Sequence, residues 1–147
     1  MLRFRLLRIP VEVHPSHLAM SAVLALVFLP KGGGEGWPDR VLSQEGSPGY
    51  TQTVVLYVAS WVAIIFVSAL VHEMGHALAA RRLGYSPKIQ LVWLGGLTYP
   101  NATGPIPWNK QVLFTAAGPA AGLALGGVAL AGHLVIGEYA EIPGYLL

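Results

Sequence analysis

The sequence predicts an all-α membrane protein with about three transmembrane helices and a membrane-embedded β-hairpin or re-entrant loop between the second and the third. The 147 residues are 54% hydrophobic and only 11% charged, whereas soluble domains carry about 25% charged residues. Apolar segments recur at about residues 15–30, 52–84 and 109–136. Residues 88–100 instead combine strand-forming residues with a Gly-Gly break. We expect residues 1–147 to form a single domain.

The first predicted helix follows a basic amino-terminal segment. Residues 1–13 alternate in part between apolar and charged residues, which predicts a short strand at the membrane interface. A basic head before an apolar stretch also suits a secretory signal, but no small-x-small cleavage site follows Leu29. We therefore expect a retained membrane helix.

The second predicted helix contains the longest uncharged run, residues 53–71, which comes close to crossing the ~30 Å hydrocarbon core. A loop rich in Gly, Pro and Ser, at residues 30–52, precedes it. Two arginines and then Gly84 suit the negative end of the helix dipole and a glycine C-cap. The helix should end there.

A zinc-binding pattern, H-E-x-x-H, follows the uncharged run as His72-Glu73-Met74-Gly75-His76. Residues four apart share one helix face, so His72 and His76 can turn imidazole nitrogens toward one Zn²⁺ ion. Glu73 lies about 100° further round the helix and can take a proton from water as general base. A histidine pair can also simply occupy the headgroup zone, but ionisable residues inside spans are usually functional.

Residues 85–110 have two interpretations. One is an ordinary loop with buried aromatic residues. The other is a hairpin whose exposed strand edge pairs with an extended peptide substrate. In the second interpretation the strand edge would hold a peptide next to the metal site in the extended conformation that proteases cut.

The third predicted helix carries small residues in Gly118-Pro119-Ala120-Ala121-Gly122 and again in Gly126-Gly127. Small residues four apart let helix backbones approach closely in membranes. Pro119 also frees a backbone carbonyl near this face. We expect His133, beyond the apolar middle, at the membrane interface and not as a ligand.

The distribution of charge indicates orientation and excludes some partners. Basic residues flank the apolar segments and do not form one patch, so we expect a lipid bilayer and no nucleic acid as partner. They concentrate at the amino end and after the second helix, which predicts a multi-pass cell-membrane protein with its amino terminus and active site toward the cytoplasm. The chain has no cysteine, which excludes disulfides and thiolate ligands. The oligomeric state stays open.

These motifs together resemble the site-2 protease family of intramembrane zinc metalloproteases. The resemblance rests on the H-E-x-x-H pattern in a span, on residues 9–16 (IPVEVHPS), on Leu94-Gly95-Gly96-Leu97 and on residues 117–122 (AGPAAG). These features occur in family order and cover nearly the whole chain.

The resemblance implies a Zn²⁺-dependent endopeptidase that hydrolyses peptide bonds in or near transmembrane segments of membrane-protein or peptide substrates. It implies that His72 and His76 bind the metal and that Glu73 is the catalytic base. It also implies that Leu94, Gly95 and Gly96 belong to a substrate-receiving hairpin. Gly118 and Gly122 match the family's small-residue motif that packs beside the active site, and the resemblance places them with the hairpin residues among the substrate-binding positions.

One element of the family is missing from the chain. The family takes its third zinc ligand from a Leu-Asp-Gly element on a later span, whereas the only aspartate here is Asp39, in the 30–52 loop. The simplest interpretation is a fragment whose missing span holds that aspartate. The alternative is a short variant that recruits His14, Glu138 or a partner subunit.

Two other functions compete with proteolysis. A catalytically impaired relative would bind membrane peptides without cutting them, which the missing aspartate favours and the intact Glu73 disfavours. A metal transporter would need polar residues along the other spans, where the sequence offers little beyond Ser21 and Thr115.

Overall fold

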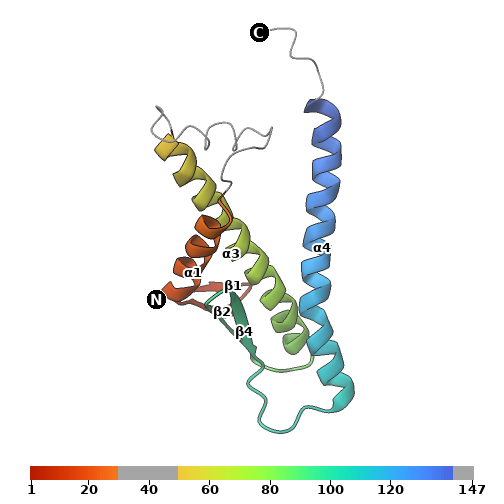
Figure 1. Cartoon of the computed structure of the whole chain (residues 1–147). Helices are drawn as coiled ribbons and strands as arrows, with labels where there is room; N and C mark the ends of the chain where they lie inside the picture. Colours follow the sequence, from red (N-terminus) through yellow and green to blue (C-terminus); the bar gives the residue numbers. More distant parts are fainter. Residues whose placement is uncertain (30–49, 141–147) are drawn as a thin grey trace.

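The computed structural model describes residues 1–29 and 50–140, with side chains as far as residue 135. Its elements are, in chain order, β1 (Leu2–Leu6), β2 (Ile9–Val13), α1 (Pro15–Val27), α3 (Tyr50–Arg82), β3 (Lys88–Val92), β4 (Gly95–Tyr99) and α4 (Trp108–Ala140). Figure 1 shows α1 and the strands on one side of α3 and α4 on the other. The predicted loop at residues 30–52 lies almost entirely outside the described residues.

The three predicted helices are present, with shifted ends. Among the described residues, α3 and α4 are the two helices long and apolar enough to cross a membrane. Helix α1 has 13 residues and is therefore about 20 Å long, shorter than the ~30 Å hydrocarbon core. Gly84 has φ +88° and follows the end of α3 as predicted, and the Tyr85 amide beyond it donates to Ala80 O at 3.0 Å.

The all-α part of the prediction is wrong, because the strands form a four-stranded mixed sheet in the order β1-β2-β3-β4. Residues 1–13 form an antiparallel hairpin and not a single strand. Its turn residues Leu7 and Arg8 have φ of 49° and 66°, the left-handed geometry that suits a two-residue hairpin turn. The predicted hairpin at residues 88–100 is confirmed as β3 and β4.

A parallel ladder joins the two hairpins into one sheet, with Val11 opposite Ile89 and Val13 opposite Leu91. Alternate side chains of β2 and β3 point to one face, as the two-residue period of a strand requires. They are at most 2% exposed and pack against the carboxyl-terminal half of α3. This buried cluster comprises Ile9, Val11, Val13, Met74, Ala77, Ile89 and Leu91. It holds the H-E-x-x-H segment of α3 against the sheet.

Helices α3 and α4 meet at one end and diverge toward the other (Figure 1). At the meeting point a Cβ on Gly75 would overlap the Ala117 carbonyl of α4. Further along α4, nothing lies within 4 Å of where a Cβ of Gly126 or Gly127 would stand. Close packing by small residues is therefore confined to the end of the helices that carries the histidines.

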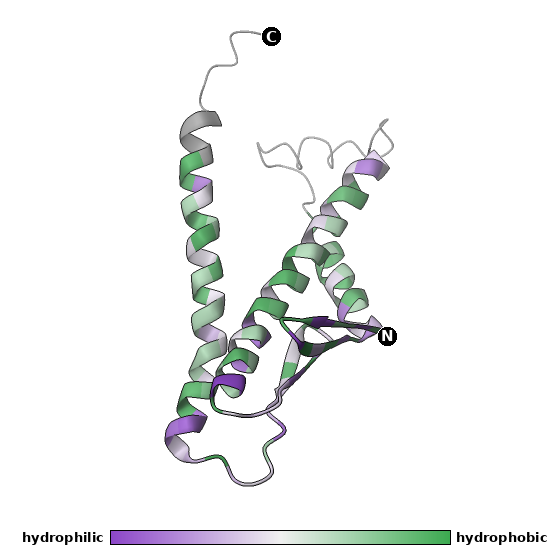
Figure 2. Cartoon of the chain, turned by 180° about the vertical axis from the view of Figure 1, so that it is seen from behind, coloured by the Kyte–Doolittle hydropathy of each residue, from purple (hydrophilic) through white to green (hydrophobic). Residues whose placement is uncertain are grey.

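Hydrophobic residues run along most of both long helices, and hydrophilic residues gather in the sheet and at the helix ends (Figure 2). Large apolar side chains such as Ile64 and Leu123 are exposed on α3 and α4. The long helices thus present apolar surface outward, while the sheet buries its apolar side chains against α3.

Candidate metal centre

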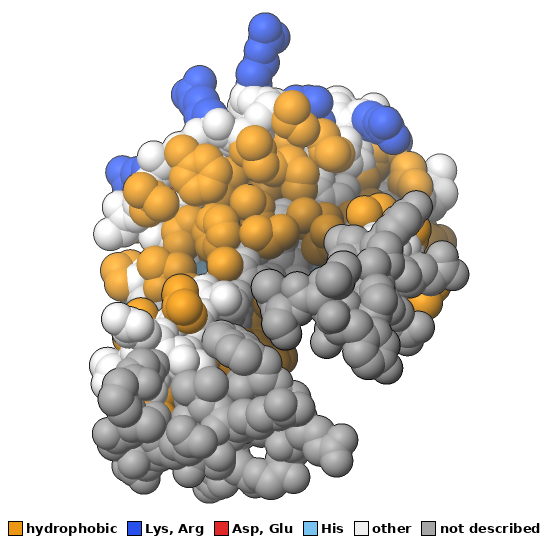
Figure 3. Space-filling view, turned by 90° about the horizontal axis from the view of Figure 1, so that it is seen from above, with side chains coloured by type: hydrophobic (Ala, Val, Ile, Leu, Met, Phe, Trp, Pro, Cys, Tyr) orange, Lys and Arg blue, Asp and Glu red, His pale blue; other side chains and the backbone are white. Residues whose placement is uncertain are grey.

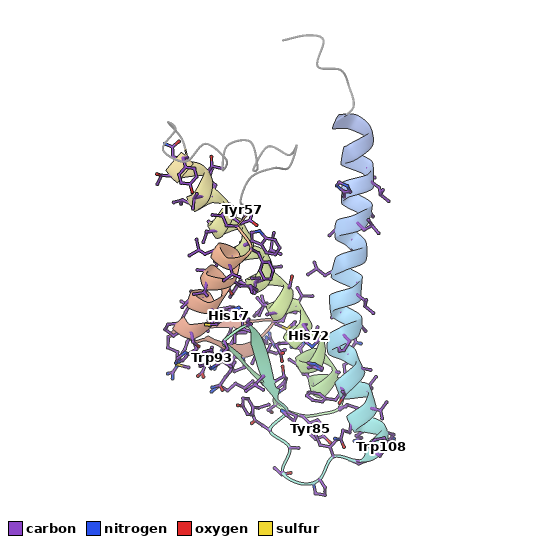
Figure 4. The ribbon with its side chains drawn as sticks, viewed as in Figure 1. His17, Tyr57, His72, Tyr85, Trp93 and Trp108 are labelled. Atoms are coloured by element: carbon purple, nitrogen blue, oxygen red, sulfur yellow. The ribbon has the colours of Figure 1, made fainter. Side chains whose placement is uncertain are left out.

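His72 and His76 lie together on the half of α3 that faces α4. Their Nε2 atoms are 3.2 Å apart, and the ring planes cross at 76°. Both side chains are partly buried. The helix period predicts this shared face, and the structure brings the two predicted metal ligands together (His72 is labelled in Figure 4).

The backbone of α4 orients the second histidine. His76 Nδ1 lies 2.7 Å from Phe114 O. Because a carbonyl oxygen only accepts, Nδ1 carries the proton and donates it there, which leaves the Nε2 lone pair free for a metal. In a metal-binding histidine, the ring nitrogen that does not bind the metal usually makes such a hydrogen bond. This bond fixes the orientation of the ring and makes the other nitrogen a stronger ligand.

Glycines on α4 make room for the two rings, but not equally. A Cβ on Gly118 would overlap the His76 ring, with Cε1 only 2.5 Å away. A Cβ on Gly122 would be 3.7 Å from His72 Nδ1, an ordinary van der Waals distance. The two positions, predicted as one motif behind the active site, therefore differ in how strictly they require glycine.

Glu73 is held on the sheet side of α3 and is 6% exposed. Thr98 Oγ1 lies 2.6 Å from Glu73 Oε2 and 3.1 Å from the Glu73 backbone oxygen. A Cβ on Gly96 would overlap the Glu73 side chain. Strand β4 therefore packs directly on the predicted base and gives its carboxylate a hydrogen-bond donor.

A cavity of about 640 Å³ opens between α3 and the turn of the β3–β4 hairpin. It is lined by His72, Glu73, the hairpin turn and an apolar stretch of α3 that includes Trp61, Ile64 and Ile65. Leu94, Gly95 and Gly96, predicted to receive substrate, all border it. Gly118 and Gly122 are not among its lining residues and lie behind the histidines.

Strand β4 is an edge of the sheet. It pairs with β3 on one side, and in the described part of the chain no strand pairs with its other side. Along β4 the burial alternates, with Gly96 and Thr98 half-buried toward Glu73 and Gly95, Leu97 and Tyr99 exposed. The free edge thus runs past the carboxylate.

The described side chains supply two nitrogen donors for a metal and no third ligand. Among residues 1–29 and 50–135, no group of three or more His, Asp or Glu side chains is arranged to hold an ion. His14 caps α1, with Nδ1 2.8 Å from Ser16 Oγ. Asp39 and the Glu138 side chain lie outside the described residues. The described residues can therefore provide two of the ligands that a zinc ion needs.

Sequence reasoning missed three contributors to the site: Thr98, the Phe114 carbonyl and Gly75. Each acts on a residue of another element, so no local pattern marks it. Thr98 has one weak signal, because it stands two residues after Gly96 and so faces the same side of the strand. Pro119 was expected to free a carbonyl near this face of α4, and the carbonyl four residues before it belongs to Thr115. The carbonyl that His76 contacts is instead that of Phe114.

Comparison with protein-family models, with curated proteins and with solved structures gives no match.

Proposed function

We propose that the chain belongs to an intramembrane zinc metalloprotease of the site-2 type, which hydrolyses peptide bonds in or near membrane-spanning segments. The spacing of the His72 and His76 Nε2 atoms, 3.2 Å, carries the proposal. Two nitrogens at about 2.0–2.1 Å from one tetrahedral zinc ion would be about 3.3–3.4 Å apart. The proposal also requires a third ligand from outside the described side chains or from another chain.

Zinc at this position would polarise the scissile carbonyl and lower the pKa of water toward ~7. Glu73 accepts the proton of the attacking water as the new C–O bond forms. It then delivers that proton to the amide nitrogen as the C–N bond breaks, so the proton balance closes. Thr98 keeps the carboxylate oriented through the 2.6 Å hydrogen bond.

The substrate in this proposal is an extended peptide added to the edge of β4. Unpaired backbone groups on a strand edge bind another strand through main-chain hydrogen bonds, and pockets beside the edge select side chains. The apolar lining from Trp61, Ile64 and Ile65 suits a hydrophobic substrate residue. A helical transmembrane substrate would therefore have to unwind locally before cleavage.

The membrane location is part of the proposal. It is supported by the two long apolar helices and by the gathering of basic residues at one end of α3. The β2–β3 ladder brings the basic amino-terminal hairpin beside β3, which begins with Lys88. The Arg81–Leu7 hydrogen bond joins the same hairpin to the last turn of α3, which carries Arg81 and Arg82. The proposed orientation puts this end, and the metal site near it, toward the cytoplasm.

The decisive experiment measures zinc per chain in purified protein by elemental mass spectrometry. We expect close to one zinc in the wild type and in His133→Ala, which removes an exposed histidine of α4. His76→Ala should lose the metal. Undiminished zinc in His76→Ala would refute the site.

The catalytic role is tested with a transmembrane peptide substrate in proteoliposomes. Glu73→Gln should keep its zinc and lose cleavage, because an amide cannot accept the proton of water. Cleavage at the wild-type rate by this variant would exclude Glu73 as the base.

A second candidate is a protein that binds membrane peptides without cutting them. The lack of a third ligand among the described side chains favours it. In that case the wild type would bind the substrate peptide and cleave it no faster than Glu73→Gln.

A further inference from the structure

A basic hollow of about 630 Å³ lies at the carboxyl end of α3, away from the metal centre. Four cationic side chains from the β1–β2 hairpin, the end of α3 and the start of β3 line it: Arg5, Arg8, Arg81 and Lys88. The expectation that the basic residues form no patch is therefore wrong for these four. The rest of the described lining contains no acidic residue and comprises Ile9, Pro10, Tyr85, Ser86, Pro87 and Asn101.

Long-range hydrogen bonds hold the walls of the hollow. Arg81 Nη1 donates to Leu7 O at 2.6 Å, which ties the β1–β2 turn to the end of α3. Asn101 Nδ2 donates to Ser86 O at 2.8 Å and closes the opposite side. Arg8 itself occupies the left-handed region at φ 66°, which is uncommon for a residue with a side chain. The arginines are thus presented by a built turn and not by a free tail.

Positive charge in the hollow exceeds negative charge. Among the described side chains, ion pairs join Glu12 to Arg3 and to Lys88 and leave Arg5, Arg8 and Arg81 without an acidic partner. The negative end of the α3 dipole is close, but it amounts to about half a unit charge. The three positive charges of Arg5, Arg8 and Arg81 are larger than this partial negative charge.

The hollow also lies at the depth of lipid headgroups if α3 spans a membrane, because α3 ends there. Leu6 and Leu7, which lie between Arg5 and Arg8 in the chain, are exposed apolar residues. Figure 3 shows Lys and Arg side chains projecting along one margin of the molecule, beside a broad hydrophobic surface. Apolar residues beside arginines that reach into the polar zone are typical of a membrane interface.

We propose that this hollow binds the phosphate of an anionic membrane lipid, with Arg5 and Arg8 as the principal ligands. A guanidinium group matches a phosphate by two parallel N–H···O bonds. This inference depends on the membrane location within the proposed function. It does not depend on zinc or on proteolysis.

The test uses the full chain in neutral detergent, titrated with short-chain phosphatidylglycerol and, in parallel, with phosphatidylcholine. We expect saturable binding of one phosphatidylglycerol per chain and none of phosphatidylcholine. Arg5→Gln and Arg8→Gln, made separately, should each weaken binding by about tenfold or more, as the loss of a hydrogen bond to a charged group predicts. Circular dichroism checks that each variant keeps its fold.

Arg82→Gln is the matched control, because Arg82 is exposed at the same helix end and does not line the hollow. If it weakens binding as much as Arg8→Gln does, the attraction is diffuse and the site is refuted. A third arm adds glycerol phosphate or inorganic phosphate without lipid. Binding as tight as that of the lipid would overturn the lipid as the source of the phosphate.

The outcomes also separate this inference from the proposed function. A chain that retains zinc and fractionates with membranes, yet binds both lipids alike, overturns only the headgroup site. If the chain does not fractionate with membranes at all, both the proposed function and the lipid site lose their basis.

Discussion

The absent side chain of Gly118 leaves the space that the imidazole of His76 fills. A Cβ there would overlap three atoms of the ring, of which Cδ2 would be 2.6 Å away. Gly118→Ala should therefore displace His76 from Phe114 O and weaken zinc binding by about 10–100-fold, as loss of an orienting contact to a ligand does. Zinc affinity is measured by competition with a chelator.

Gly122→Ala is the control for that substitution, since its new Cβ would meet His72 at an ordinary distance of 3.7 Å. We expect its zinc affinity to stay within about twofold of the wild type. Equal losses in the two variants would show that general helix packing, and not the room for His76, decides the effect.

Thr98 is expected to act as a positioning residue for Glu73. Thr98→Val keeps the shape of the side chain and removes the hydroxyl that donates to the carboxylate. We expect kcat for peptide cleavage to fall by about tenfold or more, with KM and zinc stoichiometry unchanged. Thr98→Ser, which retains the donor, should restore most of the rate. A Ser variant as slow as the Val variant would contradict this role.

His17 is a buried polar residue that should cost stability. It is 0% exposed, and neither ring nitrogen has a hydrogen-bond partner among the described residues. An unpaired buried polar group costs about 1–3 kcal/mol. His17→Leu should therefore raise the free energy of unfolding, read as a higher Tm in detergent. Ser21→Ala, at a buried position whose hydroxyl donates to His17 O at 2.7 Å, should not. A lower Tm for His17→Leu would indicate a partner for that ring.

Glu12 should make the stability of the sheet depend on pH. Hydrogen bonds from Lys88 and then from Gln90 lower the pKa of Glu12 from its ordinary value. The folded state then binds a proton less tightly than the unfolded state, so this stabilisation is present above about pH 4.3 and is lost as the pH falls through the folded pKa. Urea unfolding between pH 7 and 3 tests this, with Glu12→Gln expected to reduce the acid dependence. An unchanged slope in that variant would exclude Glu12 as its source.

Sequence patterns predicted the helices and the second hairpin because each produces its signal within one continuous segment. Residues 1–13 were predicted as one strand, but they form the β1–β2 hairpin, and β2 is an inner strand of the sheet although it contains Pro10, a residue disfavoured there. The register explains how it is tolerated: β2 pairs with β3 only from Val11 onward, and Pro10 is opposite Arg5 of β1. The parallel ladder joins segments far apart in the sequence, which no local pattern reveals.

The same distinction applies to the site. His72, Glu73 and His76 form one motif on one helix, so spacing alone predicted that the two histidines share a face. The structure places Glu73 on the sheet side of α3, against β4. The contact between Thr98 and Glu73 depends on how β4 lies against α3, and the difference between Gly118 and Gly122 depends on how α4 crosses α3. The sequence pattern assigns Gly118 and Gly122 the same role, whereas the way α4 crosses α3 gives them different distances to the histidines.

The ladder between β2 and β3 has a consequence for the order in which the chain assembles. Glu12 and Gln90, hydrogen-bonded neighbours in this sheet, are 78 positions apart, and both α1 and α3 are made between them. Closing so long a loop carries an entropic cost that is offset only once the intervening helices are docked. The H-E-x-x-H turn can thus form early and locally, while the free edge of β4 can be completed only after residues 88–99 have left the ribosome.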